Sequence, residues 1–295
     1  DWSFLRLFAR SLWRAATKGR PSQLRVARWV PPAERTIHVL GRSLNNGFVD
    51  ALSKKARAEH TGVHGALAAA ICMAVAGDGR TTSPTPVLLG SAVDVRDQLE
   101  PAMGEEFGFY FGFSQFREQI DPSGDLWEIA RMVQAGLAQD KQHLGTLTMV
   151  RMVRLGMKLS GMGRRSTAEV ANRFAQAAPV TSGLSFVQSV PQARLSIEPK
   201  VGPMEIETLQ FAASPSAMGD MTFVVSLFAG RLQLNAMWPE PAIDELQANS
   251  IVDNVIARLE AAVSWTQWGG RSAHQFPEPR PESSDHIESE MLLVS

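Results

Sequence analysis

The sequence has one cysteine, Cys72, and one tyrosine among its 295 residues. A single cysteine excludes a disulfide within the chain and a metal site built from several thiolates. One thiol in a chain of this length is also typical of proteins from a reducing compartment. We therefore expect a cytoplasmic protein.

The sequence also lacks a charge excess and a long apolar run. Its 29 Lys and Arg residues are balanced by 30 Asp and Glu residues, a net charge of -1, so the strongly basic field of a duplex-binding protein is absent. The longest apolar stretch, 67–77, is Ala-rich and shorter than the ~18–20 residues of a membrane span. We expect neither a nucleic-acid partner nor membrane association.

Familiar site motifs are missing too. The chain contains no GxGxxG, Walker loop, HExxH, GxSxG or CxxC pattern. Only His60 and His64 have a spacing that one helix would bring to the same face. Thr61 and Gly62 interrupt that helix, so ordinary histidines at helix ends are favoured over a metal site, and we expect no bound metal.

The composition that remains, 44% hydrophobic and 20% charged, predicts a globular protein of one large domain or two modest ones. Apolar residues at helical spacing predict six helices, and alternating residues predict seven strands. The predicted helices span 3–16, 45–60, 61–76, 125–143, 167–176 and 252–263. The predicted strands span 36–44, 87–95, 106–113, 179–187, 205–212, 221–228 and 231–238, the last two joined by a turn at Ala229-Gly230.

This order of elements predicts an α/β or α+β fold with mixed sheet layers and helices packed outside. The proline-rich and acidic tail at 266–295 is typical of disordered segments. Because the sequence begins at Asp1, inside a predicted helix, we expect a further segment upstream. The basic residues between 151 and 165 indicate either a solvated cationic face or an interfacial helix on anionic lipid. Three glycines that weaken this helix favour the solvated face.

Five segments, in this order, resemble the C-terminal half of the condensation-like acyltransferases, which share the chloramphenicol-acetyltransferase fold. The first, ARAEHTGVHGALAAAICMAVA (56–76), resembles the helix pair that opens that half. The others are VLLGSAVDVRDQLEP (87–101), EEFGFYFGFSQFR (105–117), APVTSGLSF (178–186) and the final hairpin and helix (221–263). The resemblance covers roughly 45–265. It implies a C-terminal acyltransferase subdomain at 45–265, preceded at 1–44 by the end of an N-terminal subdomain and a linker.

The signature of that family, HHxxxDG, lies just before such a half. Asp1-Trp2-Ser3 is similar to the end of the motif, which implies that the histidines lie upstream of residue 1. In the family the second histidine is the general base, and the Asp pairs with an Arg of the C-terminal half. The matching position here is Arg96. The alternatives are that Asp1 caps a helix and that Arg96 is an ordinary surface charge.

The resemblance implies transfer of an acyl group from a coenzyme A or carrier-protein thioester to the hydroxyl or amine of a small-molecule acceptor. The thioester is a co-substrate, and no bound cofactor is implied. Thr181, Ser182 and Gly183 match a segment that borders the substrate channel, although the hydroxyls are favoured to satisfy backbone groups at a strand end. The alternative function is a non-catalytic module that binds carrier protein or lipid.

Overall fold

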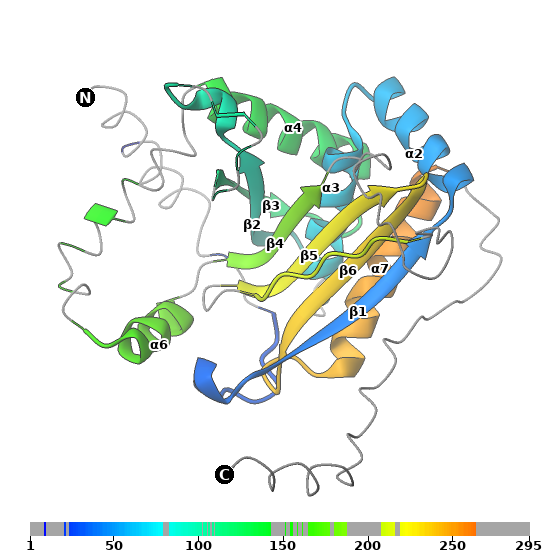
Figure 1. The fold of residues 1–295 in the computed structure, drawn as a ribbon. Helices are drawn as coiled ribbons and strands as arrows, with labels where there is room; N and C mark the ends of the chain where they lie inside the picture. The colour runs from blue at the N-terminus through cyan, green and yellow to red at the C-terminus, as the bar shows by residue number, and fades with distance from the viewer. Residues whose placement is uncertain are drawn as a thin grey trace, which may run out of the picture.

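The computed structural model describes residues 24–78, 83–101, 110–142, 165–177, 180–187, 208–215 and 219–263, together with a few isolated residues, among them 103, 104, 106 and 108. The helix predicted at 3–16 and the tail predicted at 266–295 lie outside these ranges, so both stay predictions. The fold described below is the fold of these residues (Figure 1).

The centre of the molecule is one mixed six-stranded sheet with the order β1-β6-β5-β4-β2-β3. Strand β4 runs parallel to both of its neighbours, and the other pairs are antiparallel. This confirms the predicted mixed sheet. The strands are β1 (Thr36–Leu44), β2 (Thr85–Asp94), β3 (Phe111–Ile120), β4 (Val180–Val187), β5 (Gly219–Phe228) and β6 (Arg231–Glu240).

The predicted hairpin is present, because β5 and β6 are joined by Ala229 and Gly230 alone. Both turn residues have positive φ, 48° and 73°. Such a two-residue turn matches the right-handed twist of the flanking strands. Strand β1, which lies before the boundary predicted at residue 45, pairs with β6 along its whole length. The predicted division of the chain into 1–44, 45–265 and 266–295 stays a prediction.

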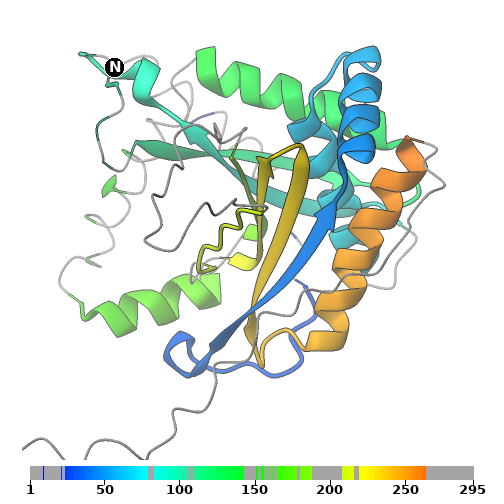
Figure 2. The same ribbon diagram turned by 45° about the vertical axis from the view of Figure 1, so that its right-hand side comes forward.

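Helices cover one face of the sheet (Figures 1 and 2). Helix α3 lies at the centre of this layer, and its residues 65–76 are all buried against α4, α7 and the strands. Among the described residues no single helix is long and apolar enough to cross a membrane. The helices are α2 (Asn46–Ala58), α3 (Val63–Asp78), α4 (Leu126–Gln142), α6 (Thr167–Ala177) and α7 (Glu245–Ala262), with short 3-10 turns η1 (Pro32–Glu34) and η2 (Arg96–Gln98).

Side-chain caps fix the start of several helices. The Asn45 side chain accepts a hydrogen bond from the Phe48 N–H at 2.9 Å and so caps α2, whose start was predicted at residue 45. Ser166 and Glu169 bond reciprocally at the start of α6, the arrangement known as a capping box. These local bonds explain why the helix starts could be read from the sequence.

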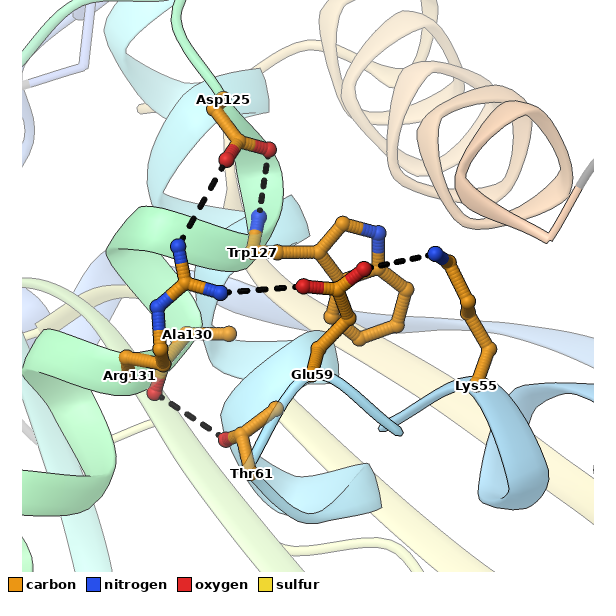
Figure 3. A network of polar contacts seen from close by, with 7 residues as sticks. All are labelled: Lys55, Glu59, Thr61, Asp125, Trp127, Ala130 and Arg131. Carbon is orange, nitrogen blue, oxygen red and sulfur yellow. Dashed lines mark hydrogen bonds and ion pairs between the residues drawn. The ribbon is translucent and has the colours of Figure 1, made fainter. Parts of the chain in front are cut away.

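Helices α2 and α3 meet at a bend of 95°, which is held against α4 (Figure 3). His60 lies in this bend with φ of 56°, and the Thr61 hydroxyl donates to the Ala130 carbonyl of α4 at 3.3 Å. Gly65 allows the close approach, because a Cβ atom there would lie 2.9 Å from the same carbonyl oxygen. Any larger residue would push the two helices apart.

The carboxylate of Glu59 joins the bend to α4 electrostatically (Figure 3). It accepts from Lys55 Nζ at 2.6 Å and from Arg131 Nη1 at 3.1 Å. The hydrogen bond from Lys55 is the main cause that lowers the pKa of Glu59, and Arg131 acts in the same direction. We read this network as structural, since each charge is neutralised by its neighbour.

Two predicted strands differ from the structure. The strand predicted at 106–113 begins only at Phe111, and of the residues predicted at 205–212 the described part, 208–212, forms no strand. Residues 208–215 instead run over the sheet, held by side chains of β5 and β6. The Ser226 hydroxyl donates to the Leu209 carbonyl at 3.1 Å, and Asn235 Nδ2 donates to the Phe211 carbonyl at 2.8 Å.

Candidate functional site at the carboxyl end of strand β2

The described α2, α3, α4 and α7 lie against one face of the sheet only, and the register identifies the residues on the other face. Val87 and Leu89 of β2 belong to the core beneath the helices. Side chains alternate along a strand, so Gly90, Ala92 and Asp94 lie on the opposite face. We call this opposite face the open face because no described helix of this layer covers it; residues 208–215 cover its part over β5 and β6, and the candidate site lies where β2 ends on it.

Arg96 follows the end of β2 and is fixed by Asp94. One oxygen of the Asp94 carboxylate accepts from the Arg96 backbone N–H at 2.9 Å, and the other accepts from Nη1 at 3.0 Å. The Arg96 side chain is 36% exposed, so the ion pair is screened in part by solvent. The main effect of the Asp94–Arg96 pair is on geometry, because two bonds to one carboxylate restrict both the backbone and the guanidinium of Arg96.

Tyr110 supports the same guanidinium from its flat side. The Arg96 Cζ atom lies 4.9 Å from the centre of the Tyr110 ring, within the range of a cation-π contact. The Val95 N–H donates to the Tyr110 carbonyl at 2.9 Å, which ties the two segments together. The ring can pack here because residue 108 is a glycine. A Cβ atom at this position would approach the atoms of the Tyr110 side chain to between 2.5 and 2.8 Å.

Strand β3 carries aromatic residues on the open face beside this cluster. Phe111 and Phe113 are 39% and 50% exposed, and their rings meet edge to face at 5.6 Å. Ser114 is the next residue of the strand and lies on the opposite face. Its hydroxyl donates to the Asp140 carboxylate of α4 at 2.5 Å. Exposed aromatic side chains therefore lie at the start of β3, whereas Phe116 and Ile120 further along the strand pack in the core.

The structure places the predicted residues Thr181, Ser182 and Gly183 in β4, the strand next to β2. Ser182 pairs in register with Leu89 and Met221, and Gly183 pairs with Gly90. The side chains of Thr181 and Ser182 lie outside the described part of the structure, so the direction of their hydroxyls stays a prediction.

Asp1 also lies outside the described residues, and its approach to Arg96 stays a prediction. The described partner of Arg96 is Asp94, which our reading of the sequence did not include. The VDVR segment (93–96) indicates this pair, because Asp94 and Arg96 are two residues apart at a strand end and so share a face. The sequence also gave no indication that Tyr110 would lie under the guanidinium.

The described histidines belong to no cluster of three or more metal ligands among the described residues. Helix α2 ends at Ala58 and α3 begins at Val63, so His60 and His64 do not share a helix. Burial lowers the pKa of His64 to about 4. His38 Nε2 lies 2.7 Å from a Glu240 oxygen at the edge strand β1, on the face that the helices cover.

Comparison with known proteins gives a family and a fold. Residues 42–237 match the family model described as phthiocerol/phthiodiolone dimycocerosyl transferase C-terminus. A search of curated protein sequences finds no significant match.

Among solved structures, a trichothecene 15-O-acetyltransferase from Fusarium sporotrichioides is similar with a TM-score of 0.64 and 11% identity, over 89% of this chain and 53% of that one. Polyketide synthase associated protein 5 from Mycobacterium tuberculosis is similar with a TM-score of 0.53 and 17% identity, over 79% and 54%. The condensation domain that mediates chain release from the enacyloxin polyketide synthase is similar with a TM-score of 0.56 and 10% identity, over 90% and 48%. The chain thus spans about half the length of these structures.

Proposed function

The chain belongs to the family of phthiocerol/phthiodiolone dimycocerosyl transferase C-termini, whose model matches residues 42–237, and from this membership we propose that it is the C-terminal part of an acyltransferase. Its fold is that of condensation domains and of an acetyltransferase. The acyl group would move from a coenzyme A or carrier-protein thioester to a hydroxyl or amine of a small acceptor.

The observation that carries this proposal is the fixed guanidinium of Arg96. In the resembling family an arginine at this position holds the Asp of the histidine motif. Here the guanidinium lies at the end of β2, restrained by Asp94 through two bonds and by the ring of Tyr110. An arginine fork restrained in this way can hold a carboxylate in one geometry, which a loop that carries a general base requires.

The chemistry proposed for the whole protein is a single acyl transfer. The acceptor oxygen or nitrogen attacks the thioester carbonyl carbon, and the motif histidine takes the acceptor proton. The new C–O or C–N bond forms, the C–S bond breaks, and the thiolate receives the proton from the histidine. General-base assistance of this kind contributes about 10²- to 10⁴-fold. We propose that this histidine lies upstream of residue 1 and that Arg96, through the motif Asp, positions it.

The proposal includes two thioester donors, acyl-coenzyme A and an acylated carrier protein. Two of the similar structures are named for polyketide synthases, one as a condensation domain and one as an associated protein. That likeness supports a carrier protein as the partner that delivers the thioester. In either case the donor is a co-substrate, and the proposal includes no resident cofactor or metal.

The test compares the 295-residue chain with the same chain extended by the residues that precede Asp1 in its reading frame. Both proteins are given acyl-coenzyme A and acyl-pantetheine thioesters with alcohol and amine acceptors. Thiol release and mass-spectrometric detection of the ester or amide are the readouts. We expect activity only in the extended protein, and we expect substitution of its second motif histidine to abolish it.

Two results would contradict the proposal. Turnover by the 295-residue chain that is lost on His64→Ala would place the base inside this chain. An extended protein that binds carrier protein or lipid vesicles but transfers no acyl group would favour the non-catalytic module instead.

A further inference from the structure

Three buried polar atoms in the single turn η2 have no hydrogen-bond partner among the described residues. They are Nε of Arg96 and both amide atoms, Nε2 and Oε1, of Gln98. The turn itself is well ordered by backbone bonds, since the Gln98 N–H donates to the Val95 carbonyl at 2.9 Å. The unpaired atoms therefore belong to a restrained segment.

Leaving such groups unpaired is costly. A buried donor or acceptor without a partner destabilises the folded state, and native proteins contain few of them. Asp94 already occupies Nη1 of Arg96, so the guanidinium is anchored on one side, while its buried Nε has no partner among the described residues. Three unpaired atoms on two neighbouring side chains indicate a group that satisfies them together.

The chemistry of the three atoms defines that group. Arg96 Nε and Gln98 Nε2 donate, whereas Gln98 Oε1 accepts, so the complement offers two acceptors and one donor. A phosphate dianion fits poorly because it offers only acceptors, whereas the Gln98 Oε1 atom needs a donor. A peptide segment with an acidic side chain fits, because its carboxylate and carbonyl accept and its N–H donates.

We propose that Gln98 is a further positioning residue that, together with Arg96, forms a clasp for the acidic peptide segment that carries the general base. Arg96 Nε bonds the carboxylate, and the Gln98 amide bonds the backbone of the same segment. This inference rests on the proposed acyltransferase function for its purpose. Its geometry can be tested without any acyl transfer.

The test uses the 295-residue chain with Asp1→Asn, so that the carboxylate of Asp1 cannot compete. The probe is N-acetyl-aspartate N′-methylamide, which carries one carboxylate and two peptide groups. Nitrogen-15 NMR follows the Arg96 Nε–H and Gln98 NH₂ signals during titration, and we expect both to shift together. The amide analogue N-acetyl-asparagine N′-methylamide is the control probe, and it should shift neither at the same concentration.

Substitutions of Gln98 should move stability and binding in opposite directions. Gln98→Leu removes two unpaired buried atoms, so the Tm should rise by about 2–4 °C, while binding of the probe falls at least about tenfold. Gln98→Glu should abolish binding by repelling the carboxylate. The control is Gln134→Leu, which changes an exposed glutamine of α4 and should alter neither quantity.

Each outcome decides the question. A lower Tm for Gln98→Leu, or probe binding that this substitution leaves unchanged, would overturn the clasp even if the extended protein proves to be an acyltransferase. Probe binding that depends on Gln98, in a protein whose extended form transfers no acyl group, would keep the clasp and remove the proposed reaction.

Discussion

The guanidinium of Arg96 lies against the ring of Tyr110, with 4.9 Å between Cζ and the ring centre. Asp94 holds the same guanidinium at its edge, with 3.0 Å between Nη1 and a carboxylate oxygen. Residues from two segments of the chain therefore restrain one cation. This arrangement turns a flexible side chain into a fixed group, and two predictions depend on it.

The ring of Tyr110, and not its hydroxyl, should restrain Arg96. Tyr110→Leu removes the π-face that attracts the guanidinium, a contact worth about 0.5–1 kcal/mol at an exposed site. Tyr110→Phe keeps that face. We expect the NMR order parameter of the Arg96 Nε–H bond to fall below ~0.6 in the leucine variant only. Equal mobility in both variants would mean that Asp94 suffices.

Arginine at position 96 should not be replaceable by lysine. Arg96→Lys keeps the positive charge but loses the planar fork that can bond Asp94 and a second carboxylate together. In the protein extended upstream of Asp1 we expect kcat/KM to fall about 10²-fold, the effect of a small misplacement of a catalytic group. Activity of the lysine variant near that of the wild type would show that charge alone matters.

Gly65 should be intolerant of even one methyl group. In Gly65→Ala the Cβ would collide with the Thr61 hydroxyl oxygen and lie 2.9 Å from the Ala130 carbonyl oxygen, so the contact between the bend and α4 must loosen, at about 1–3 kcal/mol of unfolding free energy. The control is Gly136→Ala in α4, where the nearest atom would be 4.0 Å away. That variant should gain about 0.5–1 kcal/mol from helix propensity. Urea unfolding of both variants measures the difference.

The stability of the protein should fall as the pH falls from 6.5 toward 4, in part because of His64. Burial lowers its pKa from 6.5 to about 4, so in this window the unfolded chain binds a proton that the folded chain does not. The contribution is therefore complete above pH 6.5 and is lost at up to ~1.4 kcal/mol per pH unit below it. His64→Gln should flatten the curve of unfolding free energy against pH, and an unchanged slope would contradict the assignment.

The turn between β5 and β6 should be stabilised by a second glycine. Ala229 has φ of 48°, a left-handed conformation that costs a residue with a Cβ roughly 1 kcal/mol. Ala229→Gly should raise the unfolding free energy by about that amount. Ala257→Gly, at an exposed position of α7, should instead lower it by about 1 kcal/mol. A loss of stability in both variants would contradict the turn geometry.

Much of the fold could be predicted because its signals are local. Asn45 caps α2, Ala229-Gly230 turns the hairpin, a continuous apolar run marks α3, and periodicity marks α7. The start of β3 could not be predicted, since the alternating aromatic residues before Phe111 continue the same pattern in sequence. We attribute the start of β3 at Phe111 to the Tyr110 ring, which packs against Gly108 and against Arg96. Arg96 comes from a different segment of the chain, so its contact could not be predicted from the local pattern.

The sequence by itself determined the mixed sheet, the helix layer and Arg96 as the residue of interest, because strand alternation, helix caps and a family resemblance are properties of neighbouring residues. Only the tertiary structure decided what surrounds Arg96. Asp94 was a neighbour in the chain, but Tyr110 reaches the guanidinium because β3 returns beside β2. The open face and its exposed Phe113 were decided in the same way. Alternation fixes that two faces exist, and the packing of distant helices decides which of them becomes the core.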